Sequence, residues 1–285
     1  MESCTPDRYR IKWAEYKKEK VPYLLQSFDG ECPFICLINI LFLKKKLVLP
    51  VNTKYVSFSY LTQSISSVIP DEDPEWVSDI LNSLRKGLIF NCRFDSTDAI
   101  IEDDPARLFK LFDIPVKHCW IADPEHYAVL TRFNYDEVQS LLAIHQSNDA
   151  VDHGTRREFD SQETAVILDF FDKYATQLTQ LGVATLKTEV EPDSLIALYR
   201  NNHFLVATLH NGELYSLVSD SSFLYHGCIW ESVETFSYFD DKFEPYTSEP
   251  KARPARKPTL MERIKQYFRD RRLKKAQANA QQSAR

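Results

Sequence analysis

The sequence predicts one mixed α+β domain with a mostly antiparallel sheet. Three observations lead to this fold class. Several stretches repeat apolar residues at helical spacing behind a capping residue, a stretch rich in β-branched and aromatic residues surrounds Asn211-Gly212, and one apolar run covers Phe34 to Leu43. That run is about half as long as a bilayer-spanning helix, so we expect it in a core. With 285 residues, 44% of them hydrophobic, the chain favours a folded domain over a disordered one.

Charge divides the chain into an acidic body and a basic tail. We predict a domain over residues 1–246, a proline-containing linker over 247–258 and an amphipathic basic helix in the tail, 259–285. Residues 251–285 hold 12 Lys and Arg against 2 Asp and Glu, which leaves −16 on residues 1–250 for a net charge of −6. An acidic body favours basic partners over nucleic acid. The tail leaves three roles open: an anionic membrane surface, a nuclear-import or nucleic-acid patch, or a solvated helix without a target.

Cysteine usage and the N-terminal segment predict a location inside the cell. The six cysteines have irregular spacing and show no disulfide framework, so we expect reduced thiols. Residues 1–20 are polar and charged and do not resemble a secretory signal. We therefore expect a monomeric protein of the cytoplasm, and also of the nucleus if the tail acts there.

Three helices are predicted from their caps. The first begins at Asp73 and ends at Gly87, and the second begins at Asn134, with a glutamate three residues on. The third is capped by Ser161 and runs to Gly182. A strand is expected over residues 114–121.

Asn211-Gly212 predicts a hairpin with a two-residue loop, because both residues tolerate positive φ. In such a hairpin Asp220 lies opposite His203 on the same face, where its carboxylate would orient the imidazole. A slip of one residue would remove this pairing, so it is a hypothesis.

Cys32 is the candidate nucleophile. Pro33 suits the first position of the apolar helix, which makes Cys32 the predicted N-cap at the positive end of the helix dipole. A thiolate is stabilised there. The alternative is that Cys32 is an ordinary buried small residue.

Two further residues complete the candidate site. His203 opens the hairpin and is the candidate base, while the Gln26 amide, six residues before Cys32, is placed to donate to an oxyanion. A loop-bracing amide is the alternative for Gln26. His118-Cys119 lacks a second pair at zinc spacing and the glycines form no phosphate loop, so we expect no metal or nucleotide cofactor.

The motifs in order resemble the MINDY family of deubiquitinases over about residues 20–240. The resemblance rests on Gln26 to Pro33, on Arg200-Asn-Asn-His-Phe204, and on segments at 111–124, 214–220 and 230–232. It implies a papain-like cysteine peptidase that hydrolyses isopeptide bonds in polyubiquitin, preferentially lysine-48-linked chains, without metal or cofactor. It also implies that Cys32 is the nucleophile, His203 the base and Gln26 the oxyanion donor.

The sequence departs from this family at Glu31, where the family often has proline. A carboxylate pointing inward there would disfavour the Cys32 thiolate. The competing interpretations are therefore a ubiquitin-chain-binding module with little or no activity and a peptidase for another ubiquitin-like modifier.

Overall fold

The computed structural model describes residues 7–27, 31–88, 90–100, 106–147 and 161–247. Within these ranges helices and strands are mixed, which confirms the predicted α+β class. The basic tail and nearly all of the predicted linker lie outside the described residues. No helix in the described part of the chain is long and apolar enough to span a membrane.

The secondary structure follows the chain in this way. The strands are β1 (Arg8–Tyr16), β2 (Glu19–Leu25), β3 (Tyr55–Ser57), β4 (Asn91–Cys92), β5 (Ala99–Ile100), β6 (Val116–His118), β7 (Leu195–Arg200), β8 (His203–His210), β9 (Glu213–Leu217), β10 (Trp230–Ser232) and β11 (Tyr238–Phe239). The helices are α1 (Cys32–Leu43), α2 (Phe58–Val68), α3 (Pro74–Arg85), α4 (Ala106–Leu111), α5 (Pro124–Leu130), α6 (Tyr135–Ser147), α7 (Ser161–Lys173) and α8 (Gln180–Glu189), with a 3-10 turn η1 (Ser221–Phe223).

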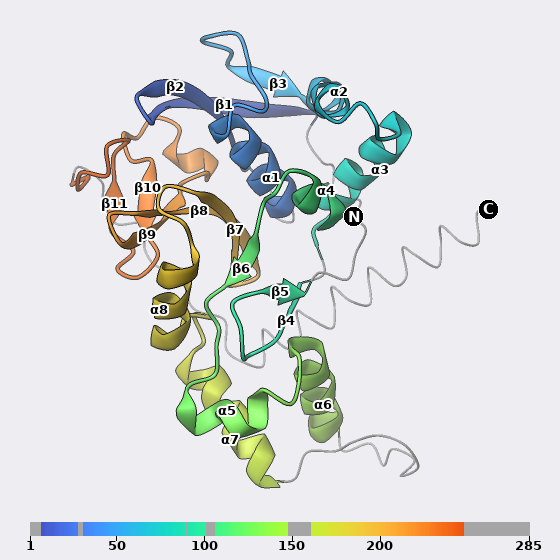
Figure 1. Ribbon diagram of the computed structural model, residues 1–285, viewed down its shortest axis with the longest axis vertical. Coiled ribbons are helices and arrows are strands. Elements are labelled where there is room, and N and C mark those ends of the chain that lie inside the picture. The colour runs from blue at the N-terminus through green and yellow to red at the C-terminus, as the bar shows by residue number, and fades with distance from the viewer. Residues whose placement is uncertain (1–6, 28–30, 89, 101–105, 148–160, 248–285) are drawn as a thin grey trace.

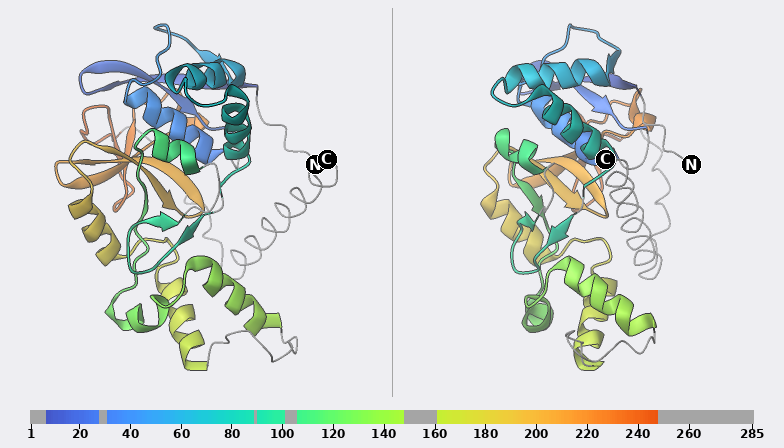
Figure 2. Two further views of the ribbon diagram at one scale, coloured as in Figure 1. Left: turned by 45° about the vertical axis from the view of Figure 1, so that its right-hand side comes forward. Right: turned by 90° about the vertical axis from the view of Figure 1, so that its right-hand side faces the viewer.

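Helix α1 is the centre of the fold. It lies between the sheet β2-β1-β3 and the larger sheet β11-β10-β9-β8-β7-β6, as Figure 1 and both views of Figure 2 show. It packs against β2 on one side and against β7 and β8 on the other. Helices α5, α6 and α7 form a separate group at one end of the molecule (Figure 1).

The larger sheet is buried on both faces. Along β7, Leu195, Ala197 and Tyr199 belong to the core that contains α1, whereas Ile196 and Leu198 belong to a second core with α8. Because side chains alternate along a strand, this two-sided burial explains why β7 is apolar at nearly every position. All pairings in this sheet are antiparallel except that of β6 with β7.

Two of the three predicted helices are confirmed. Asp73 caps α3 by accepting the Glu75 amide proton at 3.0 Å. Before α6, the Asn134 side chain accepts from the Glu137 amide at 2.9 Å and the Glu137 carboxylate accepts from the Asn134 amide at 2.8 Å. This reciprocal pair is the capping box that the spacing predicts.

The prediction of one helix from Ser161 to Gly182 is wrong. The chain forms α7 and α8 with a break between them, where Gln177 has a φ of 57°. Thr179 begins α8 by accepting the Gly182 amide proton at 2.9 Å, and its own amide donates to the Cys119 carbonyl at 3.0 Å. A Cβ on Gly182 would collide with that carbonyl, so the glycine allows a close approach inside a helix start.

The predicted hairpin is confirmed, with Asn211 and Gly212 both at positive φ between β8 and β9. The strand expected over residues 114–121 is shorter than predicted, because β6 ends at His118. After it, the chain turns so that the Trp120 amide donates to the imidazole of His118 at 3.0 Å.

Candidate functional site

Cys32 is the first helical residue of α1. Glu31 is the N-cap and its carbonyl accepts the Ile35 amide proton at 3.0 Å, so the helix begins one residue earlier than predicted and Pro33 is the second helical residue. All twelve residues of α1 are buried. Cys32 therefore stays in the first turn, where the unpaired amides and the helix dipole favour a negative charge.

His203 is the first residue of β8 and pairs with Arg200 at the end of β7. The turn between them consists of Asn201 and Asn202, with φ values of 52° and 59°. Asparagine is one of the few residues that tolerate this left-handed region, so the turn sequence determines where β8 begins. The His203 side chain is half-buried.

Cys32 lies on α1 and His203 on β8, two elements that pack together, and both residues lie at the ends that point away from one pocket. The last residue of α1, Leu43, shares a pocket with Leu195 and Ile196, which begin β7. Cys32 lies about 16 Å away at the other end of α1. Arg200 and His203 likewise form the other end of the β7–β8 hairpin. The helix start and the start of β8 are thus both remote from that pocket.

The backbone of Gln26 is hydrogen-bonded to the two residues on either side of Asp220. Its amide donates to the Ser219 carbonyl at 2.7 Å, and its carbonyl accepts the Ser221 amide proton at 2.9 Å. Gln26 follows β2, whereas Asp220 follows β9, so two distant segments join here. This parallel bridge fixes the backbone from which the Gln26 side chain projects.

The predicted pairing of Asp220 with His203 is wrong at the level of the ladder. The β8–β9 register runs from Ala207–Ser216 to His210–Glu213, as predicted, but β9 ends at Leu217. Asp220 instead caps η1, with its carboxylate accepting the Ser222 amide proton at 2.7 Å. The chain leaves the strand because it pairs with Gln26 there.

Glu31 is buried, and its carboxylate has partners from two other elements. The Tyr9 hydroxyl of β1 donates to Oε1 at 3.0 Å, and Arg85 Nε of α3 lies 3.5 Å from the same oxygen. Burial raises the pKa of Glu31, and the bond from Tyr9 and the charge of Arg85 oppose this rise. No motif in the sequence indicates that Tyr9 or Arg85 contacts Glu31. The two contacts join residues 22 and 54 positions apart, and such distant contacts leave no local pattern.

The family follows from a direct comparison of sequences. The sequence model of the MINDY deubiquitinase family matches residues 7–247, which is most of the chain and spans all of its described part. The chain belongs to the MINDY deubiquitinase family. The match includes Gln26, Cys32 and His203.

Curated members of the MINDY family are similar over most of this chain. Ubiquitin carboxyl-terminal hydrolase MINDY-1 of Danio rerio is 30% identical over 252 residues, which is 81% of this chain and 47% of the relative. Ubiquitin carboxyl-terminal hydrolase MINDY-2 of Homo sapiens is 30% identical over 245 residues, 79% of this chain and 38% of the relative. The chain thus covers less than half the length of these two relatives.

A second cluster of ionisable residues lies in this MINDY chain between α5 and α7. Donor atoms of Asp123, Glu125 and His126 approach one another within 4.8 Å. The Lys173 ammonium contacts both carboxylates, and the Tyr174 hydroxyl donates to Asp123 at 2.5 Å. These contacts pair both carboxylates with the Lys173 ammonium and join the two helices, so we assign the cluster a structural role.

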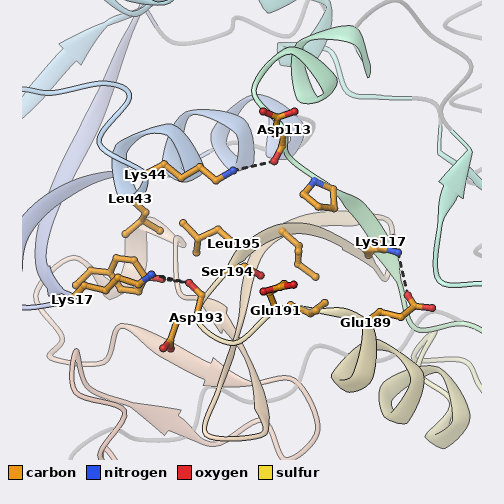
Figure 3. A pocket seen from close by; sticks show the side chains of 14 residues that line it. Lys17, Leu43, Lys44, Asp113, Lys117, Glu189, Glu191, Asp193, Ser194 and Leu195 are labelled. Atoms are coloured by element: carbon orange, nitrogen blue, oxygen red, sulfur yellow. Dashed lines mark hydrogen bonds and ion pairs between the residues drawn. The ribbon is translucent and has the colours of Figure 1, made fainter.

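A pocket of about 360 Å³ lies at the C-terminal end of α1 (Figure 3). Lys44 donates to the Asp113 carbonyl and Lys17 to the Asp193 carbonyl, each at 3.0 Å, while Leu43 and Leu195 supply apolar lining. Because the pocket and Cys32 lie at opposite ends of α1, we do not assign the pocket to the candidate site.

The burial of His118 leads us to expect that the free energy of unfolding depends on pH. It is 1% exposed, its Nδ1 accepts the Trp120 amide proton, and burial lowers its pKa to about 4. Since an unfolded histidine titrates near 6.5, the unfolded chain binds more protons between pH 6.5 and 4, and stability falls as pH falls through this window. We expect His118 to contribute a loss of about 2 kcal/mol between pH 7.5 and pH 5.

Urea unfolding of the wild type and of His118→Asn at both pH values measures this contribution. The asparagine oxygen can still accept from Trp120 but does not titrate, so the loss should shrink by about 2 kcal/mol in the variant. Equal losses in the two proteins would assign the acid sensitivity to other groups.

Proposed function

We propose that this chain is a papain-like cysteine deubiquitinase that hydrolyses isopeptide bonds in polyubiquitin, preferentially in lysine-48-linked chains. The observation that carries the proposal is the position of Cys32 in the first turn of a buried helix inside the MINDY match. The curated relatives bear the name ubiquitin carboxyl-terminal hydrolase, which supports the same reaction.

In the proposed reaction, the Cys32 thiolate attacks the carbonyl carbon of ubiquitin's C-terminal glycine. The Gln26 amide donates to the oxyanion of the tetrahedral intermediate, and His203 protonates the departing lysine amine. Water then hydrolyses the thioester, with His203 as the base, and restores the thiol. The approach of the His203 imidazole and the Gln26 amide to Cys32 Sγ is part of the proposal.

Several described features support these roles. The first-turn position of Cys32 favours the thiolate, and the two backbone hydrogen bonds of Gln26 limit its movement. The start of β8 holds His203 on the strand that packs against α1. No cofactor takes part in this chemistry.

The partner in this proposal is a polyubiquitin chain, bound by a monomer in the cytoplasm, and also in the nucleus if the tail acts there. Ubiquitin's C-terminal tail carries basic residues, and residues 1–250 of this chain carry −16, so attraction has the right sign. The amphipathic tail at 259–285 would bring the domain to an anionic membrane surface. The proposed reaction does not require nucleic acid.

The second candidate is a ubiquitin-chain-binding module with little or no activity. The observation that favours it is Glu31, which places a carboxylate on the residue immediately before the proposed nucleophile. Its buried ion pair with Arg85 weighs against this candidate, because the negative charge is compensated.

Incubation of the full chain with lysine-48-linked tetraubiquitin, followed on a gel, tests the proposal. We expect shorter chains and free ubiquitin, and slower cleavage of lysine-63-linked and linear chains of the same length. Equal cleavage of all linkages would contradict the preference. Intact chains at high protein concentration, with chain binding retained, would establish the binding module, and cleavage of another modifier alone would establish a different peptidase.

The role of Asp220 is tested by Asp220→Asn. Because asparagine also caps η1, we expect chain cleavage within about twofold of the wild type. If the carboxylate orients His203 instead, loss of its charge should lower kcat by tenfold or more. Asp220→Ala serves as the control for the cap, with an expected loss of stability of about 1 kcal/mol.

A further inference from the structure

The residue immediately before Cys32 connects three elements of the fold. Glu31 is 2% exposed and ends the segment that leads into α1. Its Oε1 accepts from Tyr9 of β1 at 3.0 Å and lies 3.5 Å from Arg85 Nε of α3. The start of α1 is therefore attached to the smaller sheet and to a second helix through one carboxylate.

Arg85 needs an anionic partner at this position. Its side chain is 7% exposed, and its guanidinium lies 4.2 Å from the centre of the Phe58 ring and 5.9 Å from that of Tyr9. A buried guanidinium without a negative partner is strongly destabilising, and Glu31 supplies one. Aromatic faces stabilise the cation further.

Tyr9 completes the arrangement as a hydrogen-bond donor. Burial, followed by the charge of Glu31, raises the pKa of Tyr9 far above its usual value, so the hydroxyl keeps its proton. A protonated hydroxyl must donate to the carboxylate, which spreads the negative charge over two partners. Ion pair and hydroxyl together leave a nearly neutral group next to Cys32.

The charge balance matters because Cys32 is the adjacent residue. A carboxylate alone would disfavour a thiolate, and a guanidinium alone would favour it. Among the described residues, the ionisable groups on the segments around Cys32 are Glu31 and Cys36 on its own segment, Tyr9 from β1, Arg85 from α3 and the proposed base His203 from β8. Of these, Glu31 and Arg85 form the ion pair.

We propose that the Glu31–Arg85 ion pair, with the Tyr9 hydroxyl, is a positioning device that holds the start of α1 and balances the charge next to Cys32. This inference rests on the proposed function, since it assigns meaning to the reactivity of Cys32.

The rate of Cys32 alkylation by iodoacetamide, measured against pH on the full chain by peptide mass spectrometry, tests the device. Glu31→Gln keeps the shape and the bond from Tyr9 but removes the negative charge of Glu31 beside Cys32, so the apparent pKa of Cys32 should fall by about 0.5 to 1 unit. Arg85→Met should raise it by a similar amount. The double variant should return to within about 0.2 units of the wild type, because both charges are gone.

Two further variants separate charge from general loosening. Arg85→Lys keeps the charge and should keep the apparent pKa of Cys32. Glu72→Gln removes an exposed pair with Arg107 and should leave it unchanged. Thermal unfolding measures whether each variant is folded. If Glu31→Gln does not fold, the test rests on Arg85→Met, which should raise the apparent pKa of Cys32, and on the double variant, which should restore it. Absence of a shift, or single variants that shift in one direction without cancelling, would overturn the proposal.

Chain cleavage by the same proteins separates this inference from the proposed function. If the single variants shift the apparent pKa of Cys32 in opposite directions and the double variant cancels the shifts, but the wild type cleaves no chains, the positioning device is kept and the proposed function is overturned. A wild type that cleaves chains while Cys32 reactivity is identical in all variants would keep the function and overturn the device.

Discussion

Replacing Cys32 with alanine is expected to abolish cleavage of lysine-48-linked chains, with a loss of at least about a thousandfold in kcat/KM. Without the sulfur no acyl-enzyme can form, and among the described residues Cys32 is the one cysteine in the first turn of α1. Fluorescent chain-cleavage assays at matched concentration measure this loss. Binding of intact chains should remain, since alanine fits the space of a buried cysteine.

Cys36→Ala is the matched control for this experiment. Cys36 lies one turn further along α1 and is also buried, and burial raises its pKa well above the usual value, so its thiol is unreactive. We expect the control to cost about 1 kcal/mol of stability and to keep chain cleavage within about threefold. Cleavage that survives Cys32→Ala but not Cys36→Ala would move the nucleophile to Cys36.

Replacing Asn39 with leucine is expected to lower the free energy of unfolding by about 3 to 4 kcal/mol. Asn39 is fully buried on α1, and its amide forms two hydrogen bonds with the backbone of Leu24 in β2, at 2.6 and 3.1 Å. Leucine would leave both the amide and the carbonyl of Leu24 buried without these partners. Urea unfolding monitored by tryptophan fluorescence measures the change.

Asn82→Leu is the control, because the Asn82 amide donates to Ser78 one turn back in its own helix α3 and is half-buried. Its expected effect is below about 0.5 kcal/mol. Leu24 lies two residues before Gln26, so Asn39→Leu should also slow chain cleavage in the folded protein. A loss of less than about 1 kcal/mol for Asn39→Leu would show that Leu24 finds other partners.

Local patterns in the sequence predicted those elements whose cause is local. Asp73 and Asn134 cap helices, and Asn211-Gly212 forms a hairpin, because each depends on residues within four positions. The helix expected from Ser161 to Gly182 failed because its break depends on Cys119, about sixty residues away. The pairing of Asp220 with His203 in the ladder failed for the same reason, since the backbone of Asp220 pairs with Gln26 instead.

The sequence by itself determined the fold class, the buried helix whose start lies within one residue of Cys32, the start of β8 at His203 and the family. These depend on periodicity, capping, turn chemistry and ordered motifs, which are all written along the chain. Only the tertiary structure decided the bridge between Gln26 and Asp220 and the pairing of Glu31 with Arg85 and Tyr9. Burial removes water from these groups, and a buried polar group must then find a partner wherever the fold supplies one, however distant in sequence.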